Sequence, residues 1–582
     1  MTTAYVPPIA PHFDVVVVGS GFGGAVTAYR AAEAGLRVCL LERGRAYPPG
    51  SFPRTPSRMA RNFWDPGEGL YGLYDVWSFR GLESVVSSGL GGGSLIYANV
   101  LLRKDARWFV DDEDPRAPRP WPVTRADLDP HYARAERMLG ATPYPFAARP
   151  YSDTPKTRAM ADAARALGRA DDLQLPPLAV TFGNDPDRPR PGEPIAGGER
   201  NVHGAPRLSC VLCGECDAGC NYGSKNSLDY NYVSRAQELG AEVLTLAEVR
   251  TFAPRPGGGW TVRWVRHDPA REGRPTPTRE LPPRELTCAH LVLSAGTFGT
   301  TYLMLRNRAA LPVELPALGS RFCGNGDLLT FAFGCTSAGG GPRALDPSYG
   351  PVITSALRVG DALDGAGAEG RGFYVEDAGI PAFMTWLVEA TDGVGAARRA
   401  LRFGWRRLLH HLGVTPGTSL GGELAALLGP GTRSAGALPL LGMGRDVPDG
   451  ELYLAGDGSL ENTWTTRSSM PYFVRMRAVM RQMAEAWGAR EFRDNPLWWL
   501  RRVVTVHPLG GCPMGHDAGD GVVDAWGEVF GCPGLHVADG SVLPGPVGAN
   551  PSLTIAALAD RFADRLVERA EAATGAAAGG GR

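Results

Sequence analysis

Residues 14–24 read Asp-Val-Val-Val-Val-Gly-Ser-Gly-Phe-Gly-Gly, and this stretch decides the fold. The apolar, β-branched run Val15–Val18 is typical of a buried parallel strand. Gly19, Gly21 and Gly24 follow it as a G-x-G-x-x-G turn. In such a turn the first glycine permits the tight bend, the second lets the backbone approach a pyrophosphate, and the third allows a helix to pack closely on the strand. The stretch therefore predicts a strand, a turn and a helix that together bind a dinucleotide.

The sequence after the turn supports this interpretation. Residues 25–34 are rich in helix-forming residues, and the N-terminus of that helix offers free N–H groups to a diphosphate. A second apolar run, Val38–Leu41, ends at Glu42, an acid at the distance expected for a hydrogen bond to a ribose hydroxyl. A glycine-rich turn in another α/β fold is the alternative, and it does not require this acid. We predict an adenine-dinucleotide site formed by Gly19, Gly21, Phe22, Gly23, Gly24, Glu42 and Arg43.

Length and composition describe an ordinary globular protein. The chain has 582 residues, 43% of them hydrophobic and 21% charged, with a formal net charge of −1. This balance gives no indication of a nucleic-acid partner. The fingerprint strand begins too early for a signal peptide to precede it, and no apolar run reaches the ~20 residues of a membrane span. We therefore expect a cytoplasmic protein.

The sequence predicts two interleaved domains in an α/β (α+β overall) fold. Strand-like runs at 290–294 and 535–539 also lead into glycine-rich turns, so one sheet is expected to assemble from distant segments. The expected bounds are 12–100, 206–330 and 518–575 for a discontinuous Rossmann-like domain. Residues 101–205 and 331–517 would form a substrate-binding domain on a mixed or antiparallel sheet with helices, and residues 576–582 a disordered tail.

Three further motifs carry a family resemblance. Ser88–Asn99 reads Ser-Gly-Leu-Gly-Gly-Gly-Ser-Leu-Ile-Tyr-Ala-Asn, His507–Cys512 reads His-Pro-Leu-Gly-Gly-Cys, and Val547–Ile555 reads Val-Gly-Ala-Asn-Pro-Ser-Leu-Thr-Ile. With the N-terminal fingerprint, these motifs resemble the glucose–methanol–choline (GMC) oxidoreductases. Trp121–Thr124 and Arg321–Asp327 look most like the cholesterol-oxidase branch of that family.

The resemblance implies FAD as the cofactor. The residue before the second glycine loop is not the histidine that attaches the flavin covalently in some members, so non-covalent FAD is expected. The resemblance also implies further cofactor contacts: Gly92, Gly93 and Ser94 near the pyrophosphate and ring, Asn99 near the isoalloxazine, Val249 at the adenine, and Ala295, Gly296, Asp539, Gly540, Asn550 and Pro551 around the flavin.

His507 and Asn550 are the candidate catalytic residues. Oxidation of an alcohol by a flavin moves a hydride from carbon and a proton from oxygen, and an imidazole is a suitable proton acceptor. In the family the matching histidine faces the substrate hydroxyl, so His507 is expected to be the base or the hydrogen-bonding orienter. Asn550 matches its partner and cannot accept a proton, so it is expected to position the hydroxyl. Without the resemblance, a packed loop histidine and a helix-capping asparagine would explain the same residues.

Four cysteines form a separate cluster with the spacing Cys210-x-x-Cys213-x-x-Cys216-x-x-x-Cys220. This spacing occurs in bacterial ferredoxins, although Asn221 stands where proline usually follows. Three interpretations stay open: an iron–sulfur cluster, a Zn²⁺ site, or cysteines that shape a turn-rich loop. An iron–sulfur cluster would give reduced flavin an electron exit.

The function that we expect from the sequence is FAD-dependent oxidation of a CH–OH group in a bulky apolar alcohol, such as a 3β-hydroxysteroid. The electron acceptor would be O₂ or another compound. The alternatives are a dehydrogenase of another secondary alcohol in a biosynthetic pathway and a non-catalytic flavin-binding protein. In the resembled branch, a glutamate directly before a Thr-Trp pair marks the members that also isomerise the steroid. Here Phe383 and Met384 precede Thr385-Trp386, and Glu376 lies further upstream, so isomerisation is in doubt.

Residues 396–409 are basic and amphipathic. Such a segment is either a solvated helix or a peripheral contact with an anionic membrane.

Overall fold

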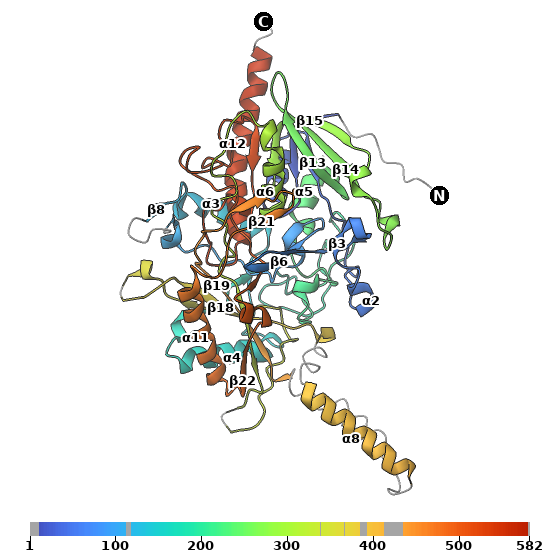
Figure 1. Ribbon diagram of the computed structural model, residues 1–582, viewed down its shortest axis with the longest axis vertical. Coiled ribbons are helices and arrows are strands. Elements are labelled where there is room, and N and C mark those ends of the chain that lie inside the picture. Colours follow the sequence, from blue (N-terminus) through green and yellow to red (C-terminus); the bar gives the residue numbers. More distant parts are fainter. Residues whose placement is uncertain are drawn as a thin grey trace.

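The computed structural model describes residues 11–111, 118–337, 339–365, 367–384, 393–412 and 435–579. Within these residues, two β-sheets form the centres of two parts of the molecule (Figure 1). One part contains the N-terminal fingerprint and the long C-terminal helix. The other contains the strands between residues 328 and 444 and the strand at residues 491–494. This agrees with the α/β class expected from the sequence, while the exact domain bounds stay a prediction.

The first sheet is the Rossmann-like sheet. Its order is β12 (Glu242–Leu244), β2 (Val38–Leu41), β1 (His12–Val18), β15 (Arg284–Leu293), β14 (Trp260–Arg266) and β13 (Ala247–Pro254), with β24 (Leu535–Val537) paired to β15. The pairs β12–β2, β2–β1, β1–β15 and β15–β24 are parallel. The sheet thus joins segments more than 500 residues apart, which confirms the expected assembly from distant segments.

Helices cover this sheet and explain the uninterrupted apolar run of β1. Val15–Val18 are at most 5% exposed because both faces of the strand are buried. Helix α1 (Phe22–Glu33) packs against α5 (Tyr232–Glu238) and α12 (Ser552–Gly579), and α12 also packs on α3 (Arg125–Met138). Helix α6 (Gly296–Asn307) follows β15 directly, as α1 follows β1. Two strand–turn–helix units therefore end at the same edge of the sheet.

The second sheet is antiparallel throughout. Its order is β10 (Leu173–Gln174), β17 (Ala356–Val359), β18 (Phe373–Asp377), β19 (Leu438–Gly444), β16 (Leu328–Phe333) and β22 (Glu491–Asp494). Helices α4 (Pro155–Ala166) and α11 (Met470–Ala486) pack together and against its strands. Met476, Met480 and Met483 of α11 are fully buried at this contact. The sheet faces the fingerprint region across the cavity described below.

A small sheet links the two parts. β5 (Tyr74–Ser78) and β6 (Leu82–Ser87) form an antiparallel pair, and β23 (Val503–Thr505) pairs with β6 in parallel. His507 follows β23 by two residues. This pairing holds the C-terminal histidine motif next to the N-terminal part of the chain.

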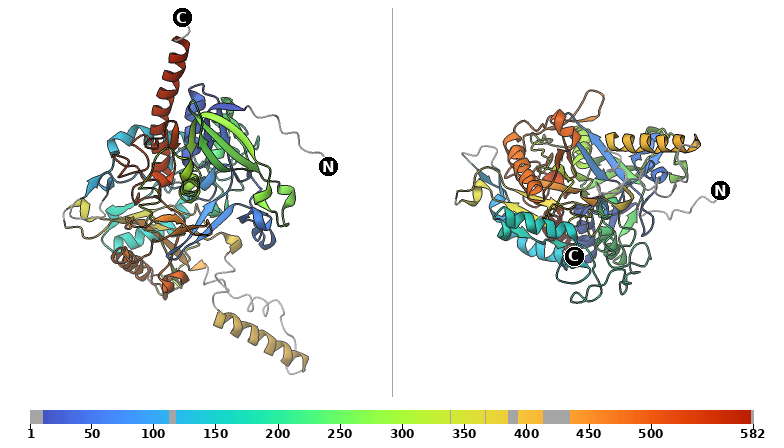
Figure 2. Two further views of the ribbon diagram at one scale, coloured as in Figure 1. Left: turned by 45° about the horizontal axis from the view of Figure 1, so that its top comes forward. Right: turned by 90° about the horizontal axis from the view of Figure 1, so that it is seen from below.

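Two segments extend from the body of the molecule. Helix α12 continues to Gly579, so residues 576–579 of the predicted disordered tail are helical. Alanine-rich sequence has a high helix propensity, which accounts for this correction. Helix α8 (Gly393–His411) projects from the opposite end of the molecule (Figures 1 and 2). Among the described residues, the structure contains no helix of the length and apolarity needed to span a membrane.

Candidate active site

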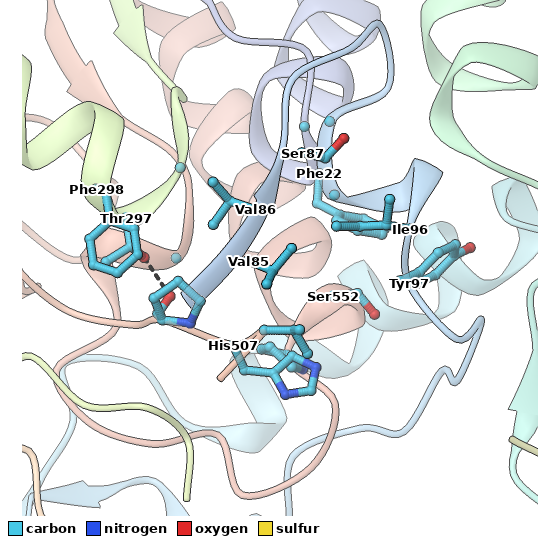
Figure 3. A pocket seen from close by; sticks show the side chains of 18 of the residues that line it. Phe22, Val85, Val86, Ser87, Ile96, Tyr97, Thr297, Phe298, His507 and Ser552 are labelled. Carbon is cyan, nitrogen blue, oxygen red and sulfur yellow. Dashed lines mark hydrogen bonds between the residues drawn. The ribbon is translucent and has the colours of Figure 1, made fainter. Parts of the chain in front are cut away.

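A cavity of about 620 Å³ connects the two parts of the molecule (Figure 3). Loops at the ends of β1, β2 and β15 line one end, and residues of β16 and β19 line the other. Val85 and Val86 of β6 lie between them. The predicted site residues that line the cavity are Gly19, Gly21, Phe22, Gly23, Glu42, Arg43, Gly92, Gly93, Val249, Ala295, Gly296, His507, Asp539, Gly540, Asn550 and Pro551. Tertiary structure thus brings together residues from both ends of the chain.

The glycines of the fingerprint have two different roles. Gly19 has φ +94°, and a Cβ there would lie 2.3 Å from the Ser294 carbonyl oxygen. Cβ atoms at Gly23 and Gly24 would lie 1.2 Å from the Ala538 oxygen and 1.9 Å from the Gly19 oxygen. These positions require glycine because the turn, α1 and the sheet are in close contact.

Gly21 and Gly93 have the second role. A Cβ on either residue would meet no protein atom within 4 Å, yet both residues line the cavity. The two loops are in contact, because a Cβ at Gly92 would lie 2.5 Å from Gly21 Cα. Protein packing does not explain glycine at 21 and 93. A cradle that two Cβ atoms would fill, next to the N-terminus of α1, fits a bound diphosphate.

The nucleoside end of the cavity contains Glu42 and Val249. The Glu42 carboxylate accepts hydrogen bonds from Ser20 N (3.0 Å), Ser20 Oγ (2.5 Å) and Gly44 N (2.8 Å). These bonds orient the acid at the end of β2. Val249 lies on β13, where the pairing with β14 shifts register between Val249 and Thr251. Both residues line the cavity, and their contacts with ribose and adenine stay predictions.

Asp539 ties the end of β24 to the start of α6. One carboxylate oxygen accepts from Ser541 N (2.9 Å) and Oγ (2.6 Å), and the other from Gly296 N (2.9 Å) and Thr300 Oγ1 (2.5 Å). Burial raises its pKa, against the effect of these bonds. Because its acceptors are used inside the protein, Asp539 builds the wall of the cavity, and backbone groups such as those of Gly540 are left to face a ligand.

His507 is oriented by a buried carboxylate. Its Nδ1 lies 2.8 Å from Asp327 Oδ1, and the other oxygen of Asp327 accepts from Thr505 Oγ1 (2.8 Å) and Val506 N (3.0 Å). Asp327 is 1% exposed. A carboxylate only accepts hydrogen bonds, so this contact requires the proton on Nδ1 and leaves Nε2 as an acceptor. Thr297 Oγ1 donates to the Pro508 oxygen (2.6 Å), which anchors the histidine loop to α6 (Figure 3).

Asn550 and Glu376 form a second buried, hydrogen-bonded pair. Asn550 Nδ2 donates to Glu376 Oε2 (3.3 Å), and Asn550 Oδ1 has no hydrogen-bond partner among the described residues. Glu376 is fully buried on β18, and burial raises its pKa to about 8, so the carboxyl is protonated at neutral pH. Asn325 fixes the loop before Asn550, since it accepts from Gly548 N (2.8 Å) and donates to the Ala549 oxygen (3.0 Å). Asn550 Oδ1 is thus a buried acceptor without a partner among the described residues, in a residue that lines the cavity.

Three predicted residues do not line the cavity: Gly24, Ser94 and Asn99. Gly24 serves strand–helix packing, as expected for the third glycine. Ser94 Oγ donates to the Gly91 oxygen (2.7 Å) and accepts from Leu228 N (3.0 Å), so it stabilises its own loop. Asn99 is fully buried with φ +71°, between the cavity residues Ala98 and Val100. The contacts of Ser94 and Asn99 with a ligand stay predictions; both polar side-chain atoms of Asn99 are buried without a hydrogen-bond partner in the described structure.

The cysteine cluster does not form a metal site in this structure. Cys210, Cys213, Cys216 and Cys220 line a separate cavity of only about 20 Å³, roughly the space of one water molecule. Within the described ranges, no group of three or more His, Cys, Asp or Glu side chains is placed to hold a metal ion. Burial raises the pKa of Cys213 to about 12 and also raises the pKa values of Cys210 and Cys216.

The described residues thus give no evidence for the iron–sulfur or the zinc interpretation, and they fit the third one, a structural loop. Lys225 holds the loop: its buried ammonium group donates to the carbonyl oxygens of Cys216 (2.7 Å), Leu95 (2.8 Å) and Tyr97 (3.2 Å). Cysteine spacing places thiols in one loop, but ligation requires every sulfur to point to one centre, and packing decides that.

Sequence reasoning did not assign the roles of three carboxyl groups. Asp327 orients His507, Glu376 holds Asn550, and Asp217 lines the cavity with an Oδ1 that has no hydrogen-bond partner in the described structure. Burial raises the pKa of Asp217 to about 6. A signal existed for Glu376, because Phe373–Asp377 is a strand with two acids and otherwise apolar side chains, and buried acids are rare without a special role. The Thr385-Trp386 pair lies outside the described residues.

Comparisons with known proteins agree with this geometry. A family model described as "FAD dependent oxidoreductase" matches residues 14–55, and one described as "GMC oxidoreductase" matches residues 467–559. A cholesterol oxidase from Mycobacterium tuberculosis (strain CDC 1551 / Oshkosh) is 31% identical over 584 residues, which cover 96% of this chain and 92% of that protein. A cholesterol oxidase from Acinetobacter baumannii is 26% identical, covering 94% of this chain and 93% of that protein.

Other similar proteins differ in what their names say. A 6'''-hydroxyparomomycin C oxidase from Streptomyces lividus is 26% identical, covering 94% of this chain and 90% of that protein. Among solved structures, a fungal aryl-alcohol oxidase has a TM-score of 0.56 at 16% identity, covering 96% of this chain and all of that one. The pyridoxine 4-oxidase from Mesorbium loti has a TM-score of 0.53 at 17% identity, covering 95% of this chain and 98% of that one. The structural similarities show the shared fold.

The fold, the glycine cradle and the fingerprint match define an FAD-dependent oxidoreductase. With the C-terminal match and a relative at 31% identity over nearly its whole length, the chain belongs to the GMC oxidoreductase family. It is an FAD-dependent enzyme of the alcohol oxidase or dehydrogenase type.

Proposed function

We propose that this enzyme oxidises the CH–OH group of a bulky apolar alcohol of the 3β-hydroxysteroid type. One observation carries the proposal: the cavity that contains His507 and Asn550 continues along an apolar wall of the second sheet. That wall is formed by Leu329 and Phe331 of β16, Leu441 of β19, and Val352, Ile353 and Met384 of the adjoining loops. Such a wall favours a large hydrocarbon body whose hydroxyl meets the polar groups at one end.

His507 is the proposed proton acceptor. Asp327 holds the proton on Nδ1, so the free Nε2 can take the proton of the alcohol hydroxyl. The buried carboxylate also stabilises the imidazolium that forms, without itself taking the proton. FAD, when bound, supplies the acceptor for the hydride that leaves the alcohol carbon.

Asn550 is the proposed positioning group. Its Nδ2 is engaged by Glu376, which fixes the orientation of the amide. The free Oδ1 can accept a hydrogen bond from the substrate hydroxyl, but an amide is too weak a base to remove the proton. In this proposal Asn550 holds the substrate hydroxyl and His507 removes its proton.

The cofactor contacts are proposed for the residues that line the cavity. Gly21, Gly93 and the N-terminus of α1 would receive the diphosphate. Glu42 and Val249 would meet the ribose and adenine, and Gly296 and Gly540 would offer backbone groups to the ring.

A substrate screen that follows flavin bleaching without oxygen tests the proposal. We expect a 3β-hydroxysterol to reduce the flavin at least about tenfold faster than a hydroxyl-rich aminoglycoside alcohol, because the apolar wall cannot satisfy additional buried hydroxyls. The 3α epimer is the matched control for the position of the hydroxyl. Reduction by the polar alcohol and not by the sterol would reject the substrate class and leave the family assignment intact. Peroxide release in air then separates an oxidase from a dehydrogenase.

A further inference from the structure

Helix α8 is a surface that the proposed reaction does not use. It runs from Gly393 to His411 and extends away from the body of the molecule in two different views (Figures 1 and 2). Packing against the rest of a protein normally stabilises an amphipathic helix, and a helix that projects into water lacks this packing. A partner could supply it, and the chemistry of the side chains on α8 indicates which kind of partner.

One face of α8 is apolar and exposed. Leu401, Trp405 and Leu408, with Leu412 directly after the helix, have 72%, 61%, 48% and 66% of their surface exposed. The spacing of four, three and four residues places these side chains on one side of a helix. Four large apolar side chains gathered on one exposed face mark an interaction site.

The rest of α8 is strongly basic. The sequence 393–411 contains five arginines and no aspartate or glutamate, in a chain whose net charge is −1. Arg398, Arg402 and Arg406 are exposed. On the helical wheel, Arg402 and Arg406 fall on the side next to the apolar face and Arg398 at its margin. The partner must therefore offer apolar contact and negative charge together.

We propose that α8 docks on the surface of an anionic lipid bilayer. The apolar face would enter the boundary between headgroups and acyl chains, with Trp405 at the depth that indole rings prefer, while the arginines contact lipid phosphates. A second copy of this chain is a poor partner, because two such helices would bring like charges together. The helix lies on the bilayer and does not cross it, in keeping with its arginines and with the absence of a spanning helix among the described residues.

Docking at α8 would also keep the cavity near the lipid. Met384 lines the cavity, and residues 385–392 alone separate it from the start of α8. That length of chain reaches at most about 30 Å. A substrate dissolved in the bilayer would then have a short path to the cavity, a consequence that rests on the proposed function, whereas the docking itself does not.

Vesicle flotation of the flavin-loaded protein tests the docking. We expect the protein to float with vesicles of phosphatidylcholine mixed with phosphatidylglycerol, to bind pure phosphatidylcholine weakly, and to dissociate as salt is raised. Leu401→Ser/Trp405→Ser should reduce the bound fraction at least about tenfold, because two inserted apolar side chains are lost. Arg398→Gln/Arg402→Gln/Arg406→Gln should remove the preference for the anionic vesicles.

The matched control is Leu239→Ser/Val474→Ser. Leu239 directly follows α5 and Val474 lies on α11, and they are 51% and 57% exposed. The control should bind vesicles as the unchanged protein does, and flavin absorbance should be the same in all variants. Equal vesicle binding by Leu401→Ser/Trp405→Ser overturns the proposal, as does absence of binding to anionic vesicles. A dimer in light scattering that this variant abolishes, without vesicle binding, would assign the face to a second copy. None of these outcomes depends on catalytic activity.

Discussion

The two ends of the cavity are built in different ways. At the fingerprint end, strands β1, β2 and β15 are parallel and buried, and the wall consists of glycine backbone at their ends, as at Gly21. At the other end the sheet is antiparallel, and side chains such as His507, Asn550 and Phe331 form the wall. The first end can bind any ligand that carries the right diphosphate, whereas the second selects a particular alcohol.

The difference extends to how each end is held in place. The glycine loops are fixed by backbone contacts that leave no room for a Cβ, as between Gly23 and Ala538. The proposed catalytic side chains are held by buried carboxyls far away in sequence: Asp327 is 180 residues from His507, and Glu376 is 174 residues from Asn550. Steric exclusion therefore governs one end, and hydrogen bonding between distant segments governs the other. Four substitutions test this comparison.

The largest effect is expected at the fingerprint end. Gly23→Ala would place a methyl group into the Ala538 oxygen, so α1 must shift away from the sheet. We expect loss of bound FAD and a lower melting temperature, as for other overpacked sites that cost about 1–3 kcal/mol or more. The absorbance ratio of flavin to protein and thermal unfolding measure both effects.

Gly21→Ala is the control for that experiment. Its Cβ meets no protein atom within 4 Å, so the protein stripped of flavin should melt as before. Its affinity for FAD should still fall at least about tenfold, the scale of one lost hydrogen-bonded contact. If Gly23→Ala and Gly21→Ala have the same melting temperature and the same affinity for FAD, the two glycines do not have different roles.

The second effect is expected at His507. His507→Ala should keep the flavin absorbance, since the residue belongs to the alcohol end of the cavity. Flavin reduction by the best alcohol should slow by about a hundredfold or more, the scale of a lost proton acceptor. Stopped-flow measurement without oxygen gives the rate, and an unchanged rate would exclude His507 from the reaction.

A smaller effect is expected at Asp327. Asp327→Asn removes the charge beside the imidazole and weakens the preference for the proton on Nδ1. We expect a rate loss of about tenfold, less than for His507→Ala, and a pH profile of flavin reduction that moves to lower pH. A slower rate with the original pH profile would indicate a structural role alone.

The smallest effect concerns Glu376 and stability. Burial raises its pKa from 4.5 to about 8, so between these values the folded protein keeps a proton that the unfolded chain releases. Stability must therefore fall as pH rises through this window. Glu376→Gln keeps an oxygen for Asn550 Nδ2 but cannot ionise. Its melting temperature should decline less with pH than that of the unchanged protein.

Two measurements complete this test. Glu238→Gln, an exposed substitution on α5, should leave the pH dependence as it is. Some decline should persist in Glu376→Gln, because burial also raises the pKa of Asp446 to about 7 and that of Asp217 to about 6. If the melting temperatures of Glu376→Gln and of the unchanged protein fall equally as pH rises, Glu376 is ionised in the folded protein.

Much of the fingerprint end could be predicted from the sequence. The run Val15–Val18, the glycine spacing and Glu42 together predicted β1, the turn, α1 and β2, and the parallel pairings confirm them. The pattern that predicts them is local, because the apolar run, the glycines and the acid all lie between residues 15 and 42. The ends of elements were less predictable: α12 continues to Gly579, since alanine-rich sequence has a high helix propensity.

The other end of the cavity could be predicted only in part. His507 and Asn550 were found through motifs, but their partners Asp327 and Glu376 were not, since no local pattern links residues so far apart. The cysteine spacing suggested a metal that the structure does not support, because spacing does not determine where sulfur atoms point. The exposure of Leu401 and Trp405 was likewise open, since an amphipathic pattern suits a packed helix as well as a projecting one.

By itself, the sequence determined that a dinucleotide is bound at the end of a parallel sheet, because glycine spacing and β-branched runs constrain the backbone within a few residues. Only the tertiary structure decided which side chains meet at the alcohol end, how the four cysteines are placed in their loop, and which helix projects from the body of the molecule. Those outcomes depend on contacts between segments hundreds of residues apart, where burial and hydrogen bonding, not local propensity, select the arrangement.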